Sequence, residues 1–137
     1  MLDCMIIGDS IAVGTAMARP ECVAYAKVGW NSWQWNKDYL SKAASHTSRT
    51  VIISLGANDH KGVKTEQELR KMRSAIKGDR VFWISPGAER KPIPQEAIER
   101  IAKEYGDTVL PRPQGHMSSD GVHPTGRGYK ILGEMAK

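Results

Sequence analysis

Residues 51–59 read Val-Ile-Ile-Ser-Leu-Gly-Ala-Asn-Asp, an apolar run that ends in a glycine and two polar residues. A short run with so little polar alternation is typical of a strand in a parallel sheet whose two faces are both covered by helices. The run Val81–Ile84, Val-Phe-Trp-Ile, has the same character. Both runs indicate a buried sheet, and the polar residues after the first run lie at a strand's carboxyl end.

Outward from these runs, short apolar segments alternate with segments of helical periodicity. The expected strands are Cys4–Ile7, Cys22–Ala26, Val51–Leu55, Val81–Ile84 and Thr108–Leu110. The expected helices include Ile11–Met17, Ser32–Ser45 and Thr125–Ala136. A further helix begins with the capping box Thr65–Glu68 and continues through Leu69, Met72 and Ile76. Another is Pro94–Tyr105, with Gly106 as a left-handed cap. This alternation predicts one domain over residues 1–137, a flavodoxin-like three-layer α/β/α fold with a five-stranded parallel sheet.

Composition and charge exclude few function classes. The formal charge of +5 indicates a mildly basic surface, which favours acidic partners such as anionic polysaccharide or nucleic acid without selecting among them. No run of like charges resembles a nucleic-acid-binding arm. We recognise neither a signal peptide nor a membrane-spanning run, and we therefore expect a cytoplasmic protein with no nucleic-acid or membrane partner. Transport on a phage particle or export by another route stays open, as does the oligomeric state.

Two cysteines, Cys4 and Cys22, are too few for a disulfide framework. Both stand at the start of expected strands, where a reduced, buried cysteine behaves as a small hydrophobic residue. We therefore favour two reduced thiols. A disulfide stays open as the alternative, because the two sulfurs would be close if the two strands were neighbours.

A serine stands at the tip of the first expected strand, in Gly8-Asp9-Ser10. A serine at this position points its hydroxyl out of the sheet and meets the first free backbone N–H groups of the next helix, which can stabilise an oxyanion. The stretch matches neither the nucleophile elbow of the α/β-hydrolases nor a P-loop. A Gly-Asp-Ser turn is common, so a purely structural role stays open at this point.

Two other strand ends carry polar side chains. Asn58, in Gly56-Ala57-Asn58-Asp59, offers two N–H donors to a bound oxygen, although a simple Asx turn is the structural alternative. In Asp120-Gly121-Val122-His123, the spacing of three lets the carboxylate reach one imidazole nitrogen and leaves the other nitrogen free to face a nucleophile. A surface loop is the alternative for that segment.

Taken together, these motifs resemble those of the SGNH hydrolases, also called GDSL-like esterases and lipases, from Met5 to about Gly133. The four matching blocks are Gly8-Asp9-Ser10, Gly29 after the second strand, Gly56-Ala57-Asn58-Asp59 and Asp120-Gly121-Val122-His123-Pro124. Gly126, Gly128 and Tyr129 also look like the family. The match at Gly29 depends on a single glycine and is the weakest of the four.

The resemblance implies a serine esterase with Ser10 as nucleophile, His123 as base and Asp120 as the residue that orients His123. It implies an oxyanion hole made of the N–H groups of Ser10 and Gly29 and the side chain of Asn58. It implies no metal and no organic cofactor. With little chain beyond the core fold, a small acyl group such as a carbohydrate O-acetyl is the first substrate that we expect.

Further residues are candidates for contact with substrate. We expect Trp30, Asp59 and Arg90 to line the site, and Arg90 with Lys91 to attract an anionic substrate, although a solvated loop is the simpler interpretation of the two cations. Trp33 and Trp35 stand at helical spacing from other apolar residues, and we expect them to pack on the sheet. A metal site of Asp59, His60, His116 and His123 is conceivable, but its spacing matches no standard ligand pattern.

The alternatives within the same family are a thioesterase and a lysophospholipase. From another class, the chain could be a polysaccharide-binding module that keeps the fold without turnover. The presence of Ser10, Asn58 and His123 together argues against that module. A basic nucleic-acid-binding domain is disfavoured by the scattered Lys and Arg residues.

Overall fold

The computed structural model describes all of residues 1–137. Five strands form one sheet, namely β1 Leu2–Gly8, β2 Val23–Ala26, β3 Thr47–Ser54, β4 Lys77–Ile84 and β5 Thr108–Leu110. Five helices connect or follow them, namely α1 Ser10–Ala18, α2 Ser32–Ala44, α3 Thr65–Ala75, α4 Pro92–Tyr105 and α5 Gly126–Met135. The strand order is β2-β1-β3-β4-β5, and every neighbouring pair is parallel. The predicted α/β/α fold is confirmed.

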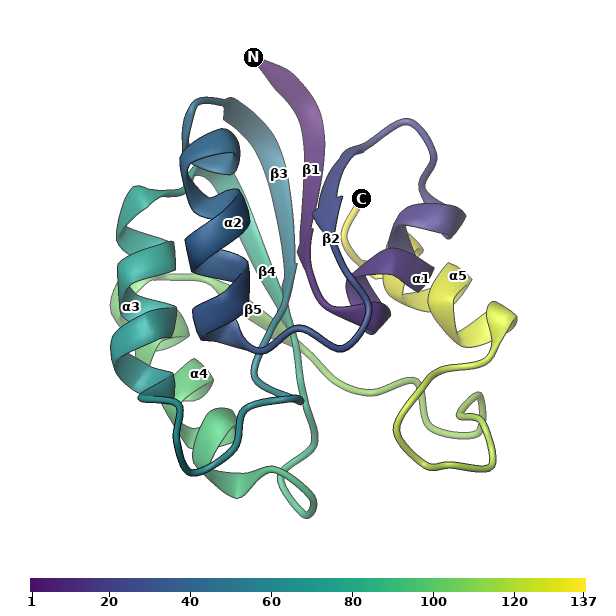
Figure 1. The fold of residues 1–137 in the computed structure, drawn as a ribbon. Coiled ribbons are helices and arrows are strands. Elements are labelled where there is room, and N and C mark those ends of the chain that lie inside the picture. Colours follow the sequence, from purple (N-terminus) through teal and green to yellow (C-terminus); the bar gives the residue numbers. More distant parts are fainter.

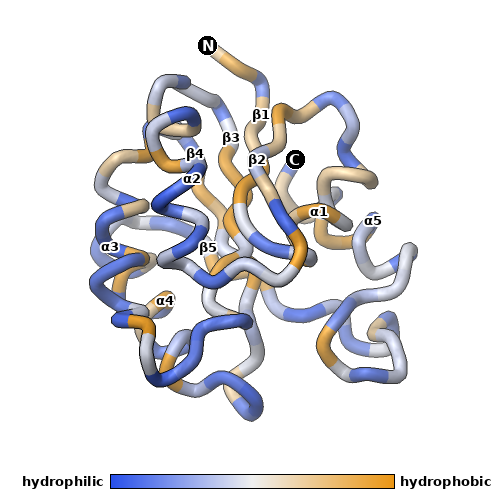
Figure 2. The backbone as a smooth tube through the Cα atoms, in the orientation of Figure 1, coloured by the Kyte–Doolittle hydropathy of each residue, from blue (hydrophilic) through white to orange (hydrophobic).

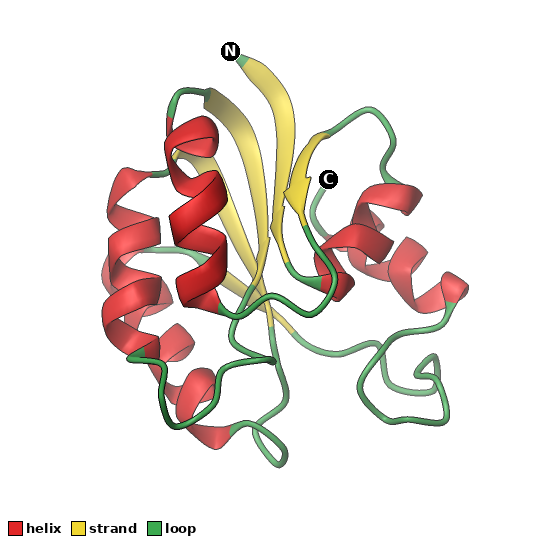
Figure 3. Ribbon diagram, in the orientation of Figure 1, coloured by secondary structure: helices red, strands yellow, loops and turns green.

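Helices cover both faces of the sheet (Figures 1 and 3). Helices α2, α3 and α4 lie on one side of the strands, and α1 and α5 lie on the other. Figure 2 shows apolar segments along the strands and polar segments along the outer turns of α2 and α3. No helix is both long and apolar enough to cross a lipid bilayer.

Alternate side chains of the central strands enter two separate cores, because successive residues of a strand point to opposite faces. The core under α2, α3 and α4 is built around Met5, Ile7, Val51, Ile53, Trp83, Trp35, Leu69, Met72, Ile98 and Ile101. The core under α1 and α5 is built around Cys4, Ile6, Ile52, Phe82, Ile84, Ile11 and Leu132. The continuous apolar runs of β1, β3 and β4 therefore serve both faces of one sheet.

One predicted helix cap and one predicted packing position are wrong. The side chain of Thr65 does not cap α3; Lys64 is the N-cap residue, and no side chain bonds to the first turn. A reciprocal capping box instead begins α2, where Asn31 Oδ1 accepts from Gln34 N and Gln34 Oε1 accepts from Asn31 N. Trp33, which was expected to pack on the sheet, is 51% exposed, because it falls on the solvent side of its helix. Trp35 is fully buried as predicted.

The two cysteines form a disulfide bond, Cys4–Cys22, so the favoured expectation of reduced thiols is not met. The disulfide required the two cysteine-bearing strands to be neighbours. This condition is met, because β1 and β2 are paired and Met5 lies opposite Val23. Both residues are buried, and Arg19 places a guanidinium nitrogen 3.7 Å from the Cys4 sulfur. The bond ties the segment between α1 and β2 to the first strand.

We expect reduction of this disulfide to lower the free energy of unfolding by about 2–3 kcal/mol, because a cross-link over 18 residues restricts the unfolded chain. Urea titrations with and without dithiothreitol measure the change. A Cys22→Ser variant is the control, since its midpoint should not respond to the reductant. Equal midpoints for the oxidised and the reduced wild-type protein would contradict the pairing.

Candidate active site

The site begins where β1 ends, at Gly8. Gly8 has φ +138°, and a Cβ built on it would lie 1.8 Å from the carbonyl oxygen of Ser54 at the end of β3. Only glycine therefore permits the two strands to approach so closely there. The next residue, Asp9, donates its N–H to the same Ser54 oxygen at 3.0 Å. Ser10, as the first residue of α1, then leaves the sheet at its carboxyl edge.

Ser10, His123 and Asp120 form a continuous hydrogen-bonded series. Ser10 Oγ lies 2.8 Å from His123 Nε2, and His123 Nδ1 lies 2.8 Å from Asp120 Oδ2. An ionised carboxylate can only accept, so the imidazole proton lies on Nδ1 and Nε2 accepts from the serine hydroxyl. Ser10 and His123 are 113 positions apart in the sequence. The three residues have the arrangement in which an imidazole can remove a hydroxyl proton.

The loop geometry holds Asp120 as an anion. Its Oδ1 accepts the backbone N–H groups of Val122 and His123 at 2.8 and 3.0 Å. The His123 backbone N–H, the His123 side chain and the Val122 N–H together keep the pKa of Asp120 far below its usual range. The carboxylate is therefore charged at neutral pH and well into the acidic range.

The site is open to water. The side chains of His123 and Asp120 are 41% and 48% exposed, and Ser10 is half-buried. Neither Ser10 nor His123 lines any of the hollows that flank the site between the strand-end loops. Ser10 is therefore approached from open solvent rather than through one of these hollows.

Three N–H groups are placed as donors near the strand ends. The backbone N–H groups of Ser10 and Gly29 have no hydrogen-bond acceptor within the protein. Asn58 uses one amide N–H for the carbonyl of Trp30, at 3.0 Å, and keeps the other one free. The Asn58–Trp30 bond also joins the loop after β2 to the loop after β3, which brings the Gly29 segment toward the same edge as Asn58.

Asp59, expected to line the site, has both carboxylate oxygens bonded within the protein. It is 7% exposed, and its two carboxylate oxygens accept from Ser32 N at 2.8 Å and Ser32 Oγ at 2.7 Å. The carboxylate thus faces the positive N-terminal end of α2, where a negative charge is favourable. It holds the start of α2 against the Asn58 loop.

The other two expected contacts stand at opposite sides of the sheet edge. Trp30 is half-buried, with its ring 5.2 Å from the ring of Tyr39 and 4.9 Å from Lys27 Nζ. Arg90 is exposed, and its guanidinium lies over Gly121, 3.3 Å from where a Cβ on that glycine would be. Arg90 therefore borders the loop that carries Asp120 and His123.

Arg112 was not identified from the sequence as part of the site. Its guanidinium donates to the carbonyl of Gly121 at 2.9 Å and to the carbonyl of Pro86. It therefore links the triad loop to the loop after β4. Partial burial lowers the pKa of Arg112. The Pro111-Arg112-Pro113 sequence at the end of β5 was the available signal, since an arginine between two prolines has a restricted backbone.

The conceivable metal ligands are not brought together. Asp59 is bonded to Ser32, and His60 Nδ1 accepts the N–H of Gly62 at 3.0 Å. The one group of His, Cys, Asp and Glu residues with ligand spacing is Cys4, Glu21 and Cys22, whose two sulfurs are bonded to each other. The Asp59–His60–His116–His123 cluster is therefore not formed.

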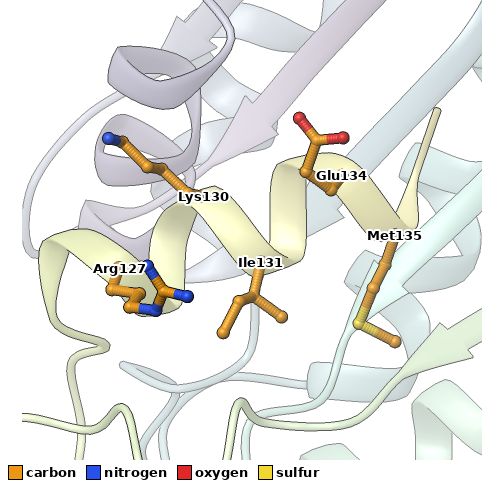
Figure 4. A pocket seen from close by; sticks show the side chains of 5 residues that line it. All are labelled: Arg127, Lys130, Ile131, Glu134 and Met135. Atoms are coloured by element: carbon orange, nitrogen blue, oxygen red, sulfur yellow. The ribbon is translucent and has the colours of Figure 1, made fainter.

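A separate hollow of about 410 Å³ lies on α5 and is lined by residues of that helix alone. Figure 4 shows Arg127, Ile131 and Met135 along one side of the helix, with Lys130 and Glu134 on the other. None of the candidate site residues reaches it.

The fold and the Ser10–His123–Asp120 series together define a class, the α/β/α proteins with a serine-histidine-aspartate site at the sheet's carboxyl edge. No family sequence profile matches the chain, and no curated protein sequence matches it. Solved structures do match the fold. A GDSL-like lipase from Bacteroides thetaiotaomicron superposes with a TM-score of 0.65 at 20% identity, over 97% of this chain and 84% of the other.

Two further structures have names that describe their activity. The C-terminal catalytic domain of peptidoglycan O-acetyltransferase A from Streptococcus pneumoniae superposes with a TM-score of 0.67 at 20% identity, over 96% of this chain and 88% of that domain. An acetyl-xylooligosaccharide esterase from Geobacillus superposes with a TM-score of 0.57 at 16% identity, over 96% and 90% of the two chains. The chain has the fold of the GDSL-like, or SGNH, hydrolases.

A buried carboxyl group lies next to the serine. Asp9 is 1% exposed; its Oδ1 accepts from Ile11 N at 3.1 Å and Ser54 Oγ at 3.0 Å, and its Oδ2 has no partner. Burial raises the pKa of Asp9 from 3.8 to about 6, against the opposing effect of those hydrogen bonds. The native state thus holds a proton on Asp9 between about pH 4 and pH 6 that the unfolded chain has already lost.

Asp9 should therefore make the protein less stable as the pH rises through this window, because the native state binds more protons than the unfolded state there. An Asp9→Asn variant has no such charge to bury. We expect it to be more stable than wild type at pH 7 by on the order of 1–3 kcal/mol, with a difference that disappears toward pH 4. Urea titrations of both proteins at several pH values measure this difference in the free energy of unfolding. Subtracting one protein from the other removes the pH dependence of the titratable groups that both share. A difference independent of pH would show that Asp9 is ionised in the native state throughout.

Proposed function

We propose that this chain is a serine esterase that hydrolyses a small acyl ester, with acetyl on a carbohydrate as the preferred substrate. The observation that carries the proposal is the series Ser10 Oγ–His123 Nε2–Asp120 at 2.8 Å for each link, with the imidazole proton on Nδ1. The similarity of fold to GDSL-like hydrolases supports it.

In the proposed reaction, His123 Nε2 takes the proton of Ser10 while Oγ attacks the ester carbonyl carbon. The N–H groups of Ser10 and Gly29 and the free amide N–H of Asn58 stabilise the oxyanion. His123 then gives its proton to the leaving alcohol oxygen as the ester C–O bond breaks, leaving an acyl-serine. Water, deprotonated by the same nitrogen, attacks the acyl carbon, and the proton returns to Ser10 as the acid leaves.

The openness of the site supports a small acyl group on a larger molecule. A triad whose His and Asp side chains are about half exposed has no dry channel around it for a long acyl chain. It does leave room for a bulky alcohol component outside the protein. The names of two structural neighbours join an acetyl group to a carbohydrate-containing substrate, which agrees with this preference. A thioesterase or lysophospholipase with a long-chain substrate would need the buried acyl site that is missing around Ser10.

Replacement of Ser10 by alanine should abolish hydrolysis of an activated acetate ester, because no other nucleophile faces His123 Nε2. A fluorescent organophosphonate should label the wild-type protein and leave Ser10→Ala unlabelled. Circular dichroism of the variant serves as the folding control. Turnover at the wild-type rate by a folded Ser10→Ala protein would refute the proposal, and absence of labelling in the wild type would favour a non-catalytic module.

Asp120→Ala should lose less activity than Ser10→Ala or His123→Ala, since Asp120 orients the imidazole without exchanging a proton with substrate. Its exposure adds to this, because water can occupy the vacated position and accept the His123 Nδ1 proton. We expect kcat of Asp120→Ala to be about ten- to a hundredfold above that of the other two variants. Equal loss in all three folded variants would assign Asp120 a direct role in the chemistry.

The acyl preference follows from the lack of a covered acyl site. Each methylene buried in a channel would contribute about 0.8 kcal/mol, so a lipase-like enzyme improves steadily with chain length. Here we expect kcat/KM to fall from acetyl through butyryl to octanoyl esters of the same leaving group. A maximum at the octanoyl ester would instead support the thioesterase or lysophospholipase alternative.

A further inference from the structure

A cationic hollow lies beside the triad, between the loop after β3 and the loop after β4. It has a volume of about 420 Å³. Its cationic side chains are Lys61, Arg90 and Lys91, and His60 also lines it. Val63 and Ile93 contribute apolar surface. Ile93 is 71% exposed. In Figure 1 the two loops lie at the lower end of the molecule, below α3 and α4.

The cations of this hollow have no acidic partner. The ion pairs of the protein involve other cations, namely Arg19, Arg70, Arg73, Arg100, Lys137 and the triad histidine. Asp59, the acid in the lining, is already bonded to Ser32, and Glu89 beside Arg90 lies within ion-pair distance of no cation. The three cations of the hollow therefore have no internal ion-pair partner, whereas Arg70 and Arg100 on α3 and α4 are paired with Glu66 and Glu104.

Two helix N-termini add to this positive field. Helices α3 and α4 both begin at the hollow, with Thr65 and Pro92 in its lining. Neither N-terminus is capped by a side chain, and the N–H of Ile93 has no acceptor within the protein. The N-terminal end of a helix carries partial positive charge that favours an anion. The acids in the first turn of α3 bond elsewhere, Glu66 to Arg70 and Arg100, and Glu68 to Asn36.

The hollow is connected to the reaction centre on two sides. Arg90 lies over Gly121, the residue after Asp120, so one wall of the hollow borders the triad loop. On the other side the lining includes Asp59, which follows the expected oxyanion donor Asn58. The hollow therefore adjoins both the triad loop and the loop that carries Asn58.

From these observations we infer that the hollow binds the acidic group of an anionic glycan whose acyl ester is presented to Ser10. This inference rests on the proposed function, because it takes an acylated carbohydrate as the substrate. The anionic group is a carboxylate or a sulfate, held by Lys61, Arg90 and Lys91, while Val63 and Ile93 contact the apolar face of a sugar ring. A nucleic acid fits less well, since no Phe, Tyr or Trp lines the hollow to stack on a base.

The test measures binding without turnover, using the Ser10→Ala protein and isothermal titration calorimetry. The probes are an unesterified tetramer of galacturonic acid, a tetramer of sulfated galactose, the neutral xylotetraose, and a short single-stranded DNA of the same charge as the galacturonate. We expect at least one acidic tetramer to bind about tenfold or more tightly than the neutral one and than the DNA. Equal affinities for acidic and neutral sugars, or DNA that binds as tightly as the acidic sugar, would overturn the inference. The preferred acidic tetramer would identify the anionic group.

Charge reversal tests the location. Lys61→Glu with Lys91→Glu in the Ser10→Ala background should weaken the acidic tetramer about tenfold or more and leave the neutral one unchanged. Lys71→Glu with Lys103→Glu changes the net charge equally, on exposed positions of α3 and α4 that make no ion pair. This control should change affinity less than twofold at physiological salt. Equal loss in both double variants would mean that only the net charge matters, and the hollow would not be the site.

The two proposals fail separately. An acidic tetramer that binds as predicted, together with a wild-type protein that hydrolyses no acetyl ester, would refute the esterase and leave an acidic-glycan-binding site. An active esterase whose Ser10→Ala variant does not distinguish acidic from neutral sugars would refute the hollow and leave the esterase.

Discussion

The approach of β1 to the end of β3 is the constraint on which the site depends. Gly8 lies so close to the Ser54 carbonyl that no side chain fits between them, and Asp9 then bonds to Ser54 through both its backbone N–H and its carboxyl group. The same carboxyl oxygen accepts the N–H of Ile11 and so begins α1. One buried acid thus ends a strand, starts a helix and places Ser10 between them. Because this carboxyl group is buried, its pKa is raised, and the arrangement costs least while Asp9 keeps its proton.

The remaining strand ends are joined by single polar contacts between loops. Asn58 bonds to the Trp30 carbonyl, Asp59 holds Ser32 at the start of α2, and Arg112 connects Gly121 with Pro86. Each contact joins loops that follow different strands. The sheet therefore supplies a common edge, and a few side chains decide how the loops along that edge sit relative to one another. This is how residues more than a hundred positions apart come within hydrogen-bond distance.

The openness of the site and its charge distribution both agree with the proposed substrate, an acyl ester on an anionic glycan. The exposed His123 and Asp120 side chains leave the reacting bond accessible to a large molecule, and the flanking hollow offers positive charge without internal partners. On α3 and α4, in contrast, Arg70 and Arg100 are paired with Glu66 and Glu104. Three cations without an ion-pair partner thus lie together beside the triad loop, where a bound anion would reduce their mutual repulsion.

The sequence by itself determined the strand–helix alternation, the α/β/α class and the motif positions Gly8-Asp9-Ser10, Asn58 and Asp120–His123, because apolar periodicity and local turn chemistry are properties of neighbouring residues. The tertiary structure decided what depends on residues distant in the chain. It paired Cys4 with Cys22, assigned Asp59 to Ser32, turned Trp33 outward and brought Arg112 to Gly121. A carboxylate or a guanidinium takes its role from whichever partner the fold places within about 3 Å, and sequence spacing carries no such distance between separate loops.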